Sequence, residues 1–253
     1  MSSWGTKRRN LIITIFLTAF FIVIATTAYV IFYEEPTCFD GVQNQSEEGV
    51  DCGGPCELLC AHQTVDVTVR WNRYFEVVPG IYNVVAYVEN QNSHARTEGL
   101  RYKFTLYDRE GAIIAEKINS IEFRPAEIIP IVENNLNTGA LRPARMTFEI
   151  IEEPVWKRAT PREPIIRVRN ERLNVVDGSP RVEAVLENVG YRPVINLRAV
   201  VILYDSDSNA IGVSSTVVDQ ITDNQSRNIL FTWPQNFQGE VARFEIIPLY
   251  DTR

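Results

Sequence analysis

The hydrophobic pattern separates one unbroken apolar run near the N-terminus from a long region of short alternating segments. No residue from Leu11 to Phe32 is charged. As a helix rising about 1.5 Å per residue, this run spans roughly 33 Å, which matches a bilayer core of about 30 Å. We therefore expect a transmembrane helix at residues 10–33, preceded by a short cytoplasmic tail at residues 1–9.

Beyond Ala61 the helical period disappears, and apolar residues alternate with polar ones in short runs. Val84, Ala86 and Val88 alternate in this way, and so do Leu197, Ala199, Val201 and Leu203. Runs rich in Val, Ile, Tyr and Phe between Pro, Gly, Asn and Asp are typical of β-sandwiches. The pattern predicts a mainly β protein behind the N-terminal helix.

Three short segments recur at nearly one spacing. Glu89-Asn90 matches Glu187-Asn188 at a shift of 98, Leu106-Tyr107-Asp108 matches Leu203-Tyr204-Asp205 at 97, and Phe148–Ile151 matches Phe244–Ile247 at 96. The recurrence predicts two copies of one domain. We expect a first β-sandwich at residues 63–153, a proline-rich linker at 154–164 and a second β-sandwich at 165–253. The short, proline-containing linker should restrict the angle between them.

The segment Phe104-Thr105-Leu106-Tyr107-Asp108 resembles the motif of the FxLYD family, a small immunoglobulin-like β-sandwich. In the second copy, Val201 stands in place of the Phe. The resemblance implies two tandem immunoglobulin-like domains that act as binding or spacer modules without catalytic residues. We expect Tyr107 and Tyr204 to pack the strand edge, and the following Asp residues to cap turns.

All four cysteines, Cys38, Cys52, Cys56 and Cys60, lie in a neck expected at residues 34–62. On the outside of a membrane, thiols are oxidised, so four clustered cysteines predict two disulfides. Sequence alone leaves all three pairings open. Zinc held by the four thiolates is the less favoured alternative, because it needs a reducing compartment.

The neck also contains oxygen donors of the kind that Ca²⁺ takes. The candidate calcium ligands are Asp40, Asn44, Glu47 and Asp51. Their spacing differs from that of the EF-hand loop. The alternative is a solvated linker held by disulfides with no metal. No cofactor other than this calcium is expected.

The neck resembles a short cysteine-rich motif of bacterial surface proteins, C-x-D-G-x-x-N-x-x-E-x-G-x-D-C-G-G-x-C-x-x-C. The matching residues are Cys38, Asp40, Gly41, Asn44, Glu47, Gly49, Asp51, Cys52, Gly53, Gly54 and Cys56. The last cysteine departs by one position, since three residues separate Cys56 from Cys60. The resemblance implies an extracellular module of anchored surface proteins.

Charge is divided unevenly along the chain. The net charge is −7, yet residues 1–33 carry Lys7, Arg8 and Arg9 and no acidic residue, which leaves −10 for the remainder. Such acidity argues against nucleic acid as a partner. Basic residues before the apolar run predict a cytoplasmic N-terminus, and therefore a single-pass protein of the cell membrane with its bulk outside. A cleaved signal peptide is the alternative, although the run is long for one.

The chain offers little material for catalysis. It has 2 His and none of the motifs G-x-S-x-G, H-E-x-x-H or a glycine-rich phosphate loop. We predict a non-enzymatic cell-surface protein that displays two β-sandwich interaction or spacer domains. Its expected partners are the lipid bilayer and another surface or envelope protein. The alternatives are an accessory subunit of a membrane or envelope assembly and, more remotely, an enzyme with an unrecognised site.

Overall fold

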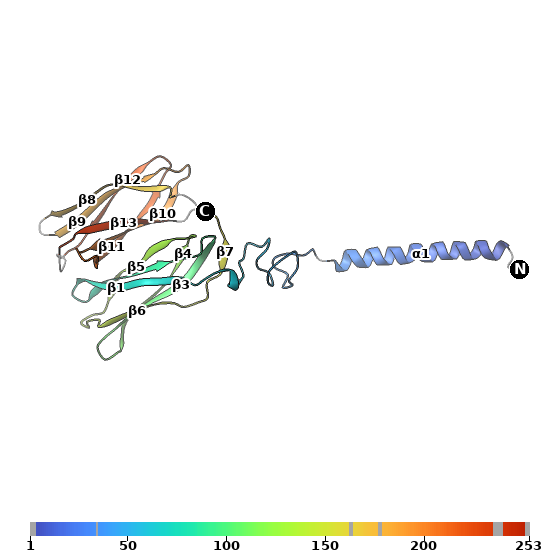
Figure 1. Ribbon diagram of the computed structural model, residues 1–253, viewed down its shortest axis with the longest axis horizontal. Coiled ribbons are helices and arrows are strands. Elements are labelled where there is room, and N and C mark those ends of the chain that lie inside the picture. Colours follow the sequence, from blue (N-terminus) through green and yellow to red (C-terminus); the bar gives the residue numbers. More distant parts are fainter. Residues whose placement is uncertain (1–3, 34, 162–163, 177–178, 235–239, 251–253) are drawn as a thin grey trace. The chain divides into compact units, whose positions relative to one another are not determined.

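The computed structural model describes residues 4–33, 35–161, 164–176, 179–234 and 240–250, which form one long helix and thirteen strands (Figure 1). Contacts within the chain divide it into two units, Met1–Cys56 and Glu57–Arg253. The elements are α1 (Trp4–Phe32), a 3-10 turn η1 (Ala61–Gln63), β1 (Thr68–Val78), β2 (Ile81–Glu89), β3 (Ala95–Tyr107), β4 (Ile113–Phe123), β5 (Ile128–Asn137), β6 (Arg145–Ile150), β7 (Trp156–Arg158), β8 (Ile166–Val176), β9 (Ser179–Asn188), β10 (Val194–Tyr204), β11 (Ala210–Ile221), β12 (Ser226–Thr232) and β13 (Arg243–Leu249).

The helix α1 carries the apolar run of the first unit. Its segment Lys7–Phe32 is long and apolar enough to cross a membrane, a property that it shares with signal sequences. The hydroxyls of Thr14, Thr18 and Thr26 each donate to the carbonyl four residues earlier, at 2.9–3.0 Å. These bonds satisfy the polar groups of the run within the helix, as a lipid environment requires. The helix begins at Trp4 rather than at residue 10, because Lys and Arg continue a helix readily.

Two β-sandwiches make up most of the second unit. The first consists of the sheet β1-β2-β5 and the sheet β4-β3-β6, with β7 added beside β3. The second consists of the sheets β8-β9-β12 and β11-β10-β13, and all strand pairs are antiparallel. The mainly β fold with two tandem sandwiches behind an apolar helix is confirmed.

Alternating side chains fill the space between the sheets of each sandwich. On β2, Val84, Ala86 and Val88 are fully buried in the first core, where they meet Tyr102 and Phe104 of β3. The residues that fill the second core in the same way include Val182, Ala184, Leu186, Leu197, Ala199, Val201 and Leu203. The period-two pattern in the sequence therefore marks the inward faces correctly.

Strand pairing confirms the duplication and corrects one of its three anchors. Tyr107 pairs with Arg145 and Tyr204 pairs with Arg243, so these arginines are equivalent at a shift of 98. The matched segments Phe148–Ile151 and Phe244–Ile247, at a shift of 96, are thus two residues out of structural register. A slip of two residues keeps every side chain on the same face of a strand, so the alternating pattern could not reveal it.

The two sandwiches also pack on each other through an apolar contact. The outer face of the sheet β1-β2-β5 meets the outer face of the sheet β11-β10-β13. The buried residues of this contact, which we call the inter-sandwich core, are Val85, Val132, Val200, Ile202, Tyr204, Ala210 and Val213. Because β2 and β10 are covered on both faces, neither shows alternating burial along its central residues.

Polar bonds from side chain to main chain surround the inter-sandwich core. The Asn83 amide donates to the carbonyl of Val213 at 3.1 Å, and the Arg198 guanidinium donates to the carbonyl of Val132 at 3.1 Å. Arg73 donates to the carbonyl of Ala210 at 2.8 Å. These bonds satisfy polar groups that the contact removes from water, so the sandwiches form a packed pair rather than two independent domains.

The expected linker at residues 154–164 contains a strand. β7 pairs with β3 of the first sandwich, with Trp156 opposite Thr97 and Arg158 opposite Ala95. Trp156 is buried, at 5% exposure. The first sandwich therefore continues past residue 153, because pairing with β3 holds the chain in a strand despite the neighbouring prolines.

Candidate functional site

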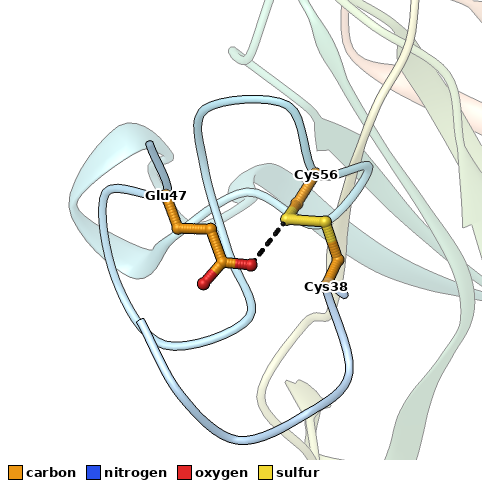
Figure 2. A group of neighbouring side chains, drawn as sticks. All are labelled: Cys38, Glu47 and Cys56. Atoms are coloured by element: carbon orange, nitrogen blue, oxygen red, sulfur yellow. Dashed lines mark hydrogen bonds between the residues drawn. A yellow bond between two sulfur atoms is a disulfide. The ribbon is translucent and has the colours of Figure 1, made fainter. Parts of the chain in front are cut away.

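The cysteine-rich loop contains a disulfide between Cys38 and Cys56, whose Cα atoms lie 5.7 Å apart (Figure 2). Cys52 and Cys60 are also disulfide-bonded, and none of the described cysteines is free. The expectation that all four cysteines form disulfides is confirmed. The structure selects one of the three pairings that the sequence leaves open.

Asp40 and Asp51 fold the first part of this loop by accepting main-chain hydrogen bonds. Asp40 accepts from the amides of Thr37 and Val42, each at 2.9 Å, and Asp51 accepts from the amides of Asp40 and Gly41 at 3.0–3.1 Å. The Thr37 amide, followed by the Asn44 side chain and the Val42 amide, lowers the pKa of Asp40 below its usual value. Both carboxylates therefore act as turn-forming groups within the loop.

Glu47 is the most buried acidic group of the loop, at 6% exposure. Its Oε2 accepts hydrogen bonds from the amides of Asn44 and Asp51, each at 3.3 Å. Its Oε1 lies 3.1 Å from Sγ of Cys56 (Figure 2). Because that sulfur carries no proton in the disulfide, this contact is oxygen packed on sulfur and not a thiol donating to a carboxylate.

The structure brings the four candidate calcium ligands into one hydrogen-bonded network. The Asn44 amide donates to Asp40 at 2.8 Å, while its own Oδ1 is buried without a hydrogen-bond partner. Among the described residues, the grouped acidic, cysteine and histidine atoms within 4.8 Å of one another are those of Cys38, Glu47 and Cys56. Two of these are disulfide sulfurs, so that group is not a metal centre. Calcium at Asp40, Asn44, Glu47 and Asp51 stays a prediction.

The repeated Tyr-Asp pairs serve the turns after β3 and β10. Asp108 accepts from the amide of Ala112 at 2.7 Å, and Asp205 accepts from the amides of Asp207 and Asn209 at 3.0 and 2.8 Å. The preceding tyrosines each carry an arginine over the ring, at 4.2 Å for Tyr107 and 3.6 Å for Tyr204. The turn-capping role expected for Asp108 and Asp205 is confirmed, whereas Tyr107 and Tyr204 lie at the ends of strands that are central in their sheets.

Burial distinguishes the two tyrosines. Tyr204 is 6% exposed because it belongs to the inter-sandwich core, whereas Tyr107 is half-buried on an open face. Burial, together with the charge of Glu245, raises the pKa of Tyr204 to about 12. The same sequence motif therefore stabilises a turn in one copy, and a turn plus a contact between domains in the other.

Two hollows lie on the described surface of the second unit. One, of about 370 Å³, lies between the two sandwiches and is lined by Tyr102, Asn119, Arg124, Arg198 and Tyr250. The Tyr102 hydroxyl donates to the buried carboxylate of Glu133 at 2.7 Å, and burial raises the pKa of Tyr102. The other, of about 510 Å³, lies on the outer face of the sheet β8-β9-β12.

Sequence reasoning missed both the inter-sandwich core and these hollows. The signal for the former is the run Ala199–Tyr204, in which every residue is apolar. A strand exposed on one face alternates, whereas a strand buried on both faces has an unbroken apolar run. The signal for the second hollow is the series of arginines in β8.

No protein-family model matches this chain, and no curated protein matches it. The solved structures that are similar to it at low level include the following three. A red sea bream transglutaminase is 11% identical with a TM-score of 0.24, and the match covers 76% of this chain and 30% of that one. A putative β-galactosidase from Bacteroides fragilis is 12% identical with a TM-score of 0.20, over 68% and 33% of the two chains.

The third is a tandem CBM22-1–CBM22-2 domain from Paenibacillus barcinonensis Xyn10C, 9% identical with a TM-score of 0.16, over 75% and 84% of the two chains. The chain thus spans about a third of the length of the first two proteins. Likenesses at these TM-scores carry no argument about what this chain does.

Proposed function

We propose that this chain is a single-pass membrane protein that displays a packed pair of β-sandwiches outside the cytoplasm, where the pair binds another surface or envelope protein. The observation that carries the proposal is the inter-sandwich core, which joins the duplicated domains into one presenting body behind an apolar helix. Two domains packed in this way present fixed outer faces, which suits recognition of a macromolecule.

Two independent features support the outside location. Lys7, Arg8 and Arg9 precede the apolar run, and basic flanks remain on the cytoplasmic side of membranes. The Cys38–Cys56 disulfide follows the run, and structural disulfides persist in oxidising compartments. Both features assign residues 34–253 to the same side, so the helix serves as a permanent anchor in this proposal.

A non-catalytic role is supported by what the repeated polar residues do. Asn90 and Asn188 bind loop carbonyls, and Asp108 and Asp205 cap turns. In each pair, the side chain is engaged by the fold itself. These four repeated residues therefore serve the architecture of the two sandwiches.

Protease accessibility in intact cells tests the topology. The full chain is given one epitope tag at each end, and cells are treated with proteinase K before and after permeabilisation. We expect loss of the C-terminal tag from intact cells, and loss of the N-terminal tag only after permeabilisation. A C-terminal tag protected in intact cells would overturn the proposal. Separation of the tags without protease would identify the helix as a cleaved signal sequence.

An accessory subunit of a membrane assembly is the second candidate, and the exposed apolar side chains of α1, such as Phe16, Phe20 and Phe21, favour it because they are available to contact another membrane helix. Crosslinking in intact cells distinguishes the two candidates. Reproducible capture of one membrane complex through residues of α1 supports the subunit. Capture through the sandwiches alone supports the surface-displayed pair.

A further inference from the structure

The duplication makes the outer faces of the two sandwiches directly comparable. In the first sandwich, the outer face of the sheet β1-β2-β5 is covered by the second sandwich. The equivalent surface of the second sandwich is the outer face of β8-β9-β12. Trp71 pairs with Tyr87 and Arg169 pairs with Val185, so arginine stands on the open face where tryptophan stands on the covered one.

The open face is defined by its outward side chains, and we call it the basic face. Inward residues of the sheet, such as Val182, Ala184 and Leu186, belong to the second core. The basic face consists of the outward residues of β9, which alternate with these inward ones, and of the residues beside them on β8 and β12. Its members are Arg167, Arg169, Arg172, Arg181, Glu183, Val185, Glu187, Asn228 and Leu230. Four of these are arginines and two are glutamates.

The two glutamates neutralise two of the arginines. Arg169 is paired with Glu187 at 2.6 Å, and Arg181 with Glu183 at 3.8 Å. Arg167 and Arg172 are exposed, and no ion pair joins either of them to another described residue. The residues named for this face therefore carry four positive and two negative charges, in a chain whose net charge is −7.

A groove of about 510 Å³ runs over this face. Arg172, Arg181 and Asn228 line it with polar groups, and Val185 and Leu230 add apolar side chains to the same lining. The strand β8 lies at the edge of its sheet and is bulged between Arg169 and Arg172. The bulge places Arg172 outward again after Asn170, which has a left-handed φ of 53°.

We propose that the basic face docks an acidic, extended polypeptide segment of a partner surface protein. Guanidinium groups bind carboxylates in bidentate pairs, which accounts for arginine rather than lysine at all four cationic positions. Apolar residues among the arginines, Val185 and Leu230, fit a strand that alternates acidic and apolar side chains. The equivalent face of the first sandwich already receives polypeptide strands, which favours a polypeptide over a phosphate polymer. The inference rests on the proposed function and specifies the partner's chemistry.

The test uses the full chain in nanodiscs of phosphatidylcholine, which has no net charge. The probe is a fluorescent ten-residue peptide of alternating Glu and Val, and the control probe alternates Lys and Val. We expect saturable binding of the Glu-Val probe alone, weakened about tenfold between 50 and 500 mM NaCl because salt screens exposed charges. The double variant R167E/R172E should weaken binding at least tenfold.

The matched control is R109E/R192E, which makes the same change in charge at two exposed arginines outside the basic face. It should bind the Glu-Val probe as the unaltered chain does. Equal weakening in both double variants, or absence of Glu-Val binding at millimolar peptide, would overturn the inference. Binding of inorganic polyphosphate without binding of the Glu-Val probe would also overturn it, in favour of a phosphate polymer. None of these outcomes alters the protease test of topology, so the two proposals fail separately.

Discussion

Asn90 and Asn188 have the same role in the two sandwiches: each donates its buried side-chain amide to one carbonyl at a strand end and one in a loop. Asn90 binds the carbonyls of Ala95 and Arg124 at 2.8 and 2.7 Å, and Asn188 binds those of Arg192 and Ile221 at 2.7 and 3.0 Å. Both asparagines are completely buried. The repeated Glu-Asn segment is thus a structural device that holds two loops at the end of each sandwich.

Substitution of either asparagine should destabilise the second unit. In Asn90→Ala or Asn188→Ala, one buried and one partly buried carbonyl lose their donors, and an unsatisfied buried group costs about 1–3 kcal/mol. We expect the free energy of unfolding, measured by denaturant titration, to fall by about 2–4 kcal/mol in each variant. Gln220→Ala removes an exposed amide and should change it by less than about 0.5 kcal/mol. A loss no larger than that of the control would show that these bonds contribute nothing.

The inter-sandwich core predicts that the two domains unfold together. Ile202 is fully buried in it, and Ile202→Asp places an unpaired charge between the sheets. We expect the single calorimetric transition of the unaltered chain to separate into two in this variant. Val217→Asp makes the same change at a residue of β11 that is 55% exposed, and should leave one transition. Two transitions in the unaltered chain would contradict the packed pair.

The duplicated Tyr-Arg pairs should differ in strength because only the Tyr204 ring is buried, whereas both arginines are exposed. Arg243 lies 3.6 Å from the Tyr204 ring in the inter-sandwich core, whereas Arg145 lies 4.2 Å from the half-buried Tyr107. A cation over an aromatic ring contributes about 0.5–1 kcal/mol when exposed and about 2 kcal/mol when desolvated. Arg243→Ala should therefore reduce the free energy of unfolding by more than Arg145→Ala does. Equal losses would show that the domain contact does not strengthen the pair.

The pKa of Tyr204 predicts a loss of stability at high pH. It is raised from 10.0 to about 12 by burial and by the Glu245 carboxylate, so the folded state favours the neutral phenol. Stability from this group is complete below pH 10 and is lost as the pH rises toward 12, because the unfolded chain releases the proton first. In Tyr204→Phe, the free energy of unfolding measured from pH 9 to 12 should fall less steeply. Identical slopes would show that Tyr204 does not titrate between these limits.

The sequence predicts the inward faces well and the outward faces poorly. Alternation identifies Val84, Ala86 and Val88 as core, since these positions face the other sheet of their own sandwich. Alternation within one sandwich does not show what covers the outward side chains of the strand. An apolar residue on that outward face is explained only by contact with the other sandwich. Val200 and Ile202 interrupt the alternation of β10 for that reason, and this interruption is the recoverable signal.

The sequence also predicts the cysteine-rich neck, residues 34–62, only in part. The presence of disulfides follows from the spacing and number of cysteines, whereas the partner of Cys38 depends on how the loop turns. In the sequence, the carboxylates of Asp40 and Asp51 are equally consistent with calcium ligands and with groups that accept main-chain hydrogen bonds in turns. The structure shows that main-chain amides already bind them, because a short loop rich in glycine has many amides to satisfy.

The unpartnered Oδ1 of Asn44 predicts that calcium binds this loop, since this buried carbonyl oxygen lacks any donor while the amide of the same side chain donates to the Asp40 carboxylate. Titration of Ca²⁺ into the full chain should produce a saturable heat at sub-millimolar to millimolar ion, the range of extracellular modules. Asn44→Ala, which removes this oxygen, should abolish the heat, and Asn174→Ala, at an exposed asparagine on β8, should preserve it. Absence of heat at millimolar Ca²⁺ would establish that the carboxylates serve only to turn the chain.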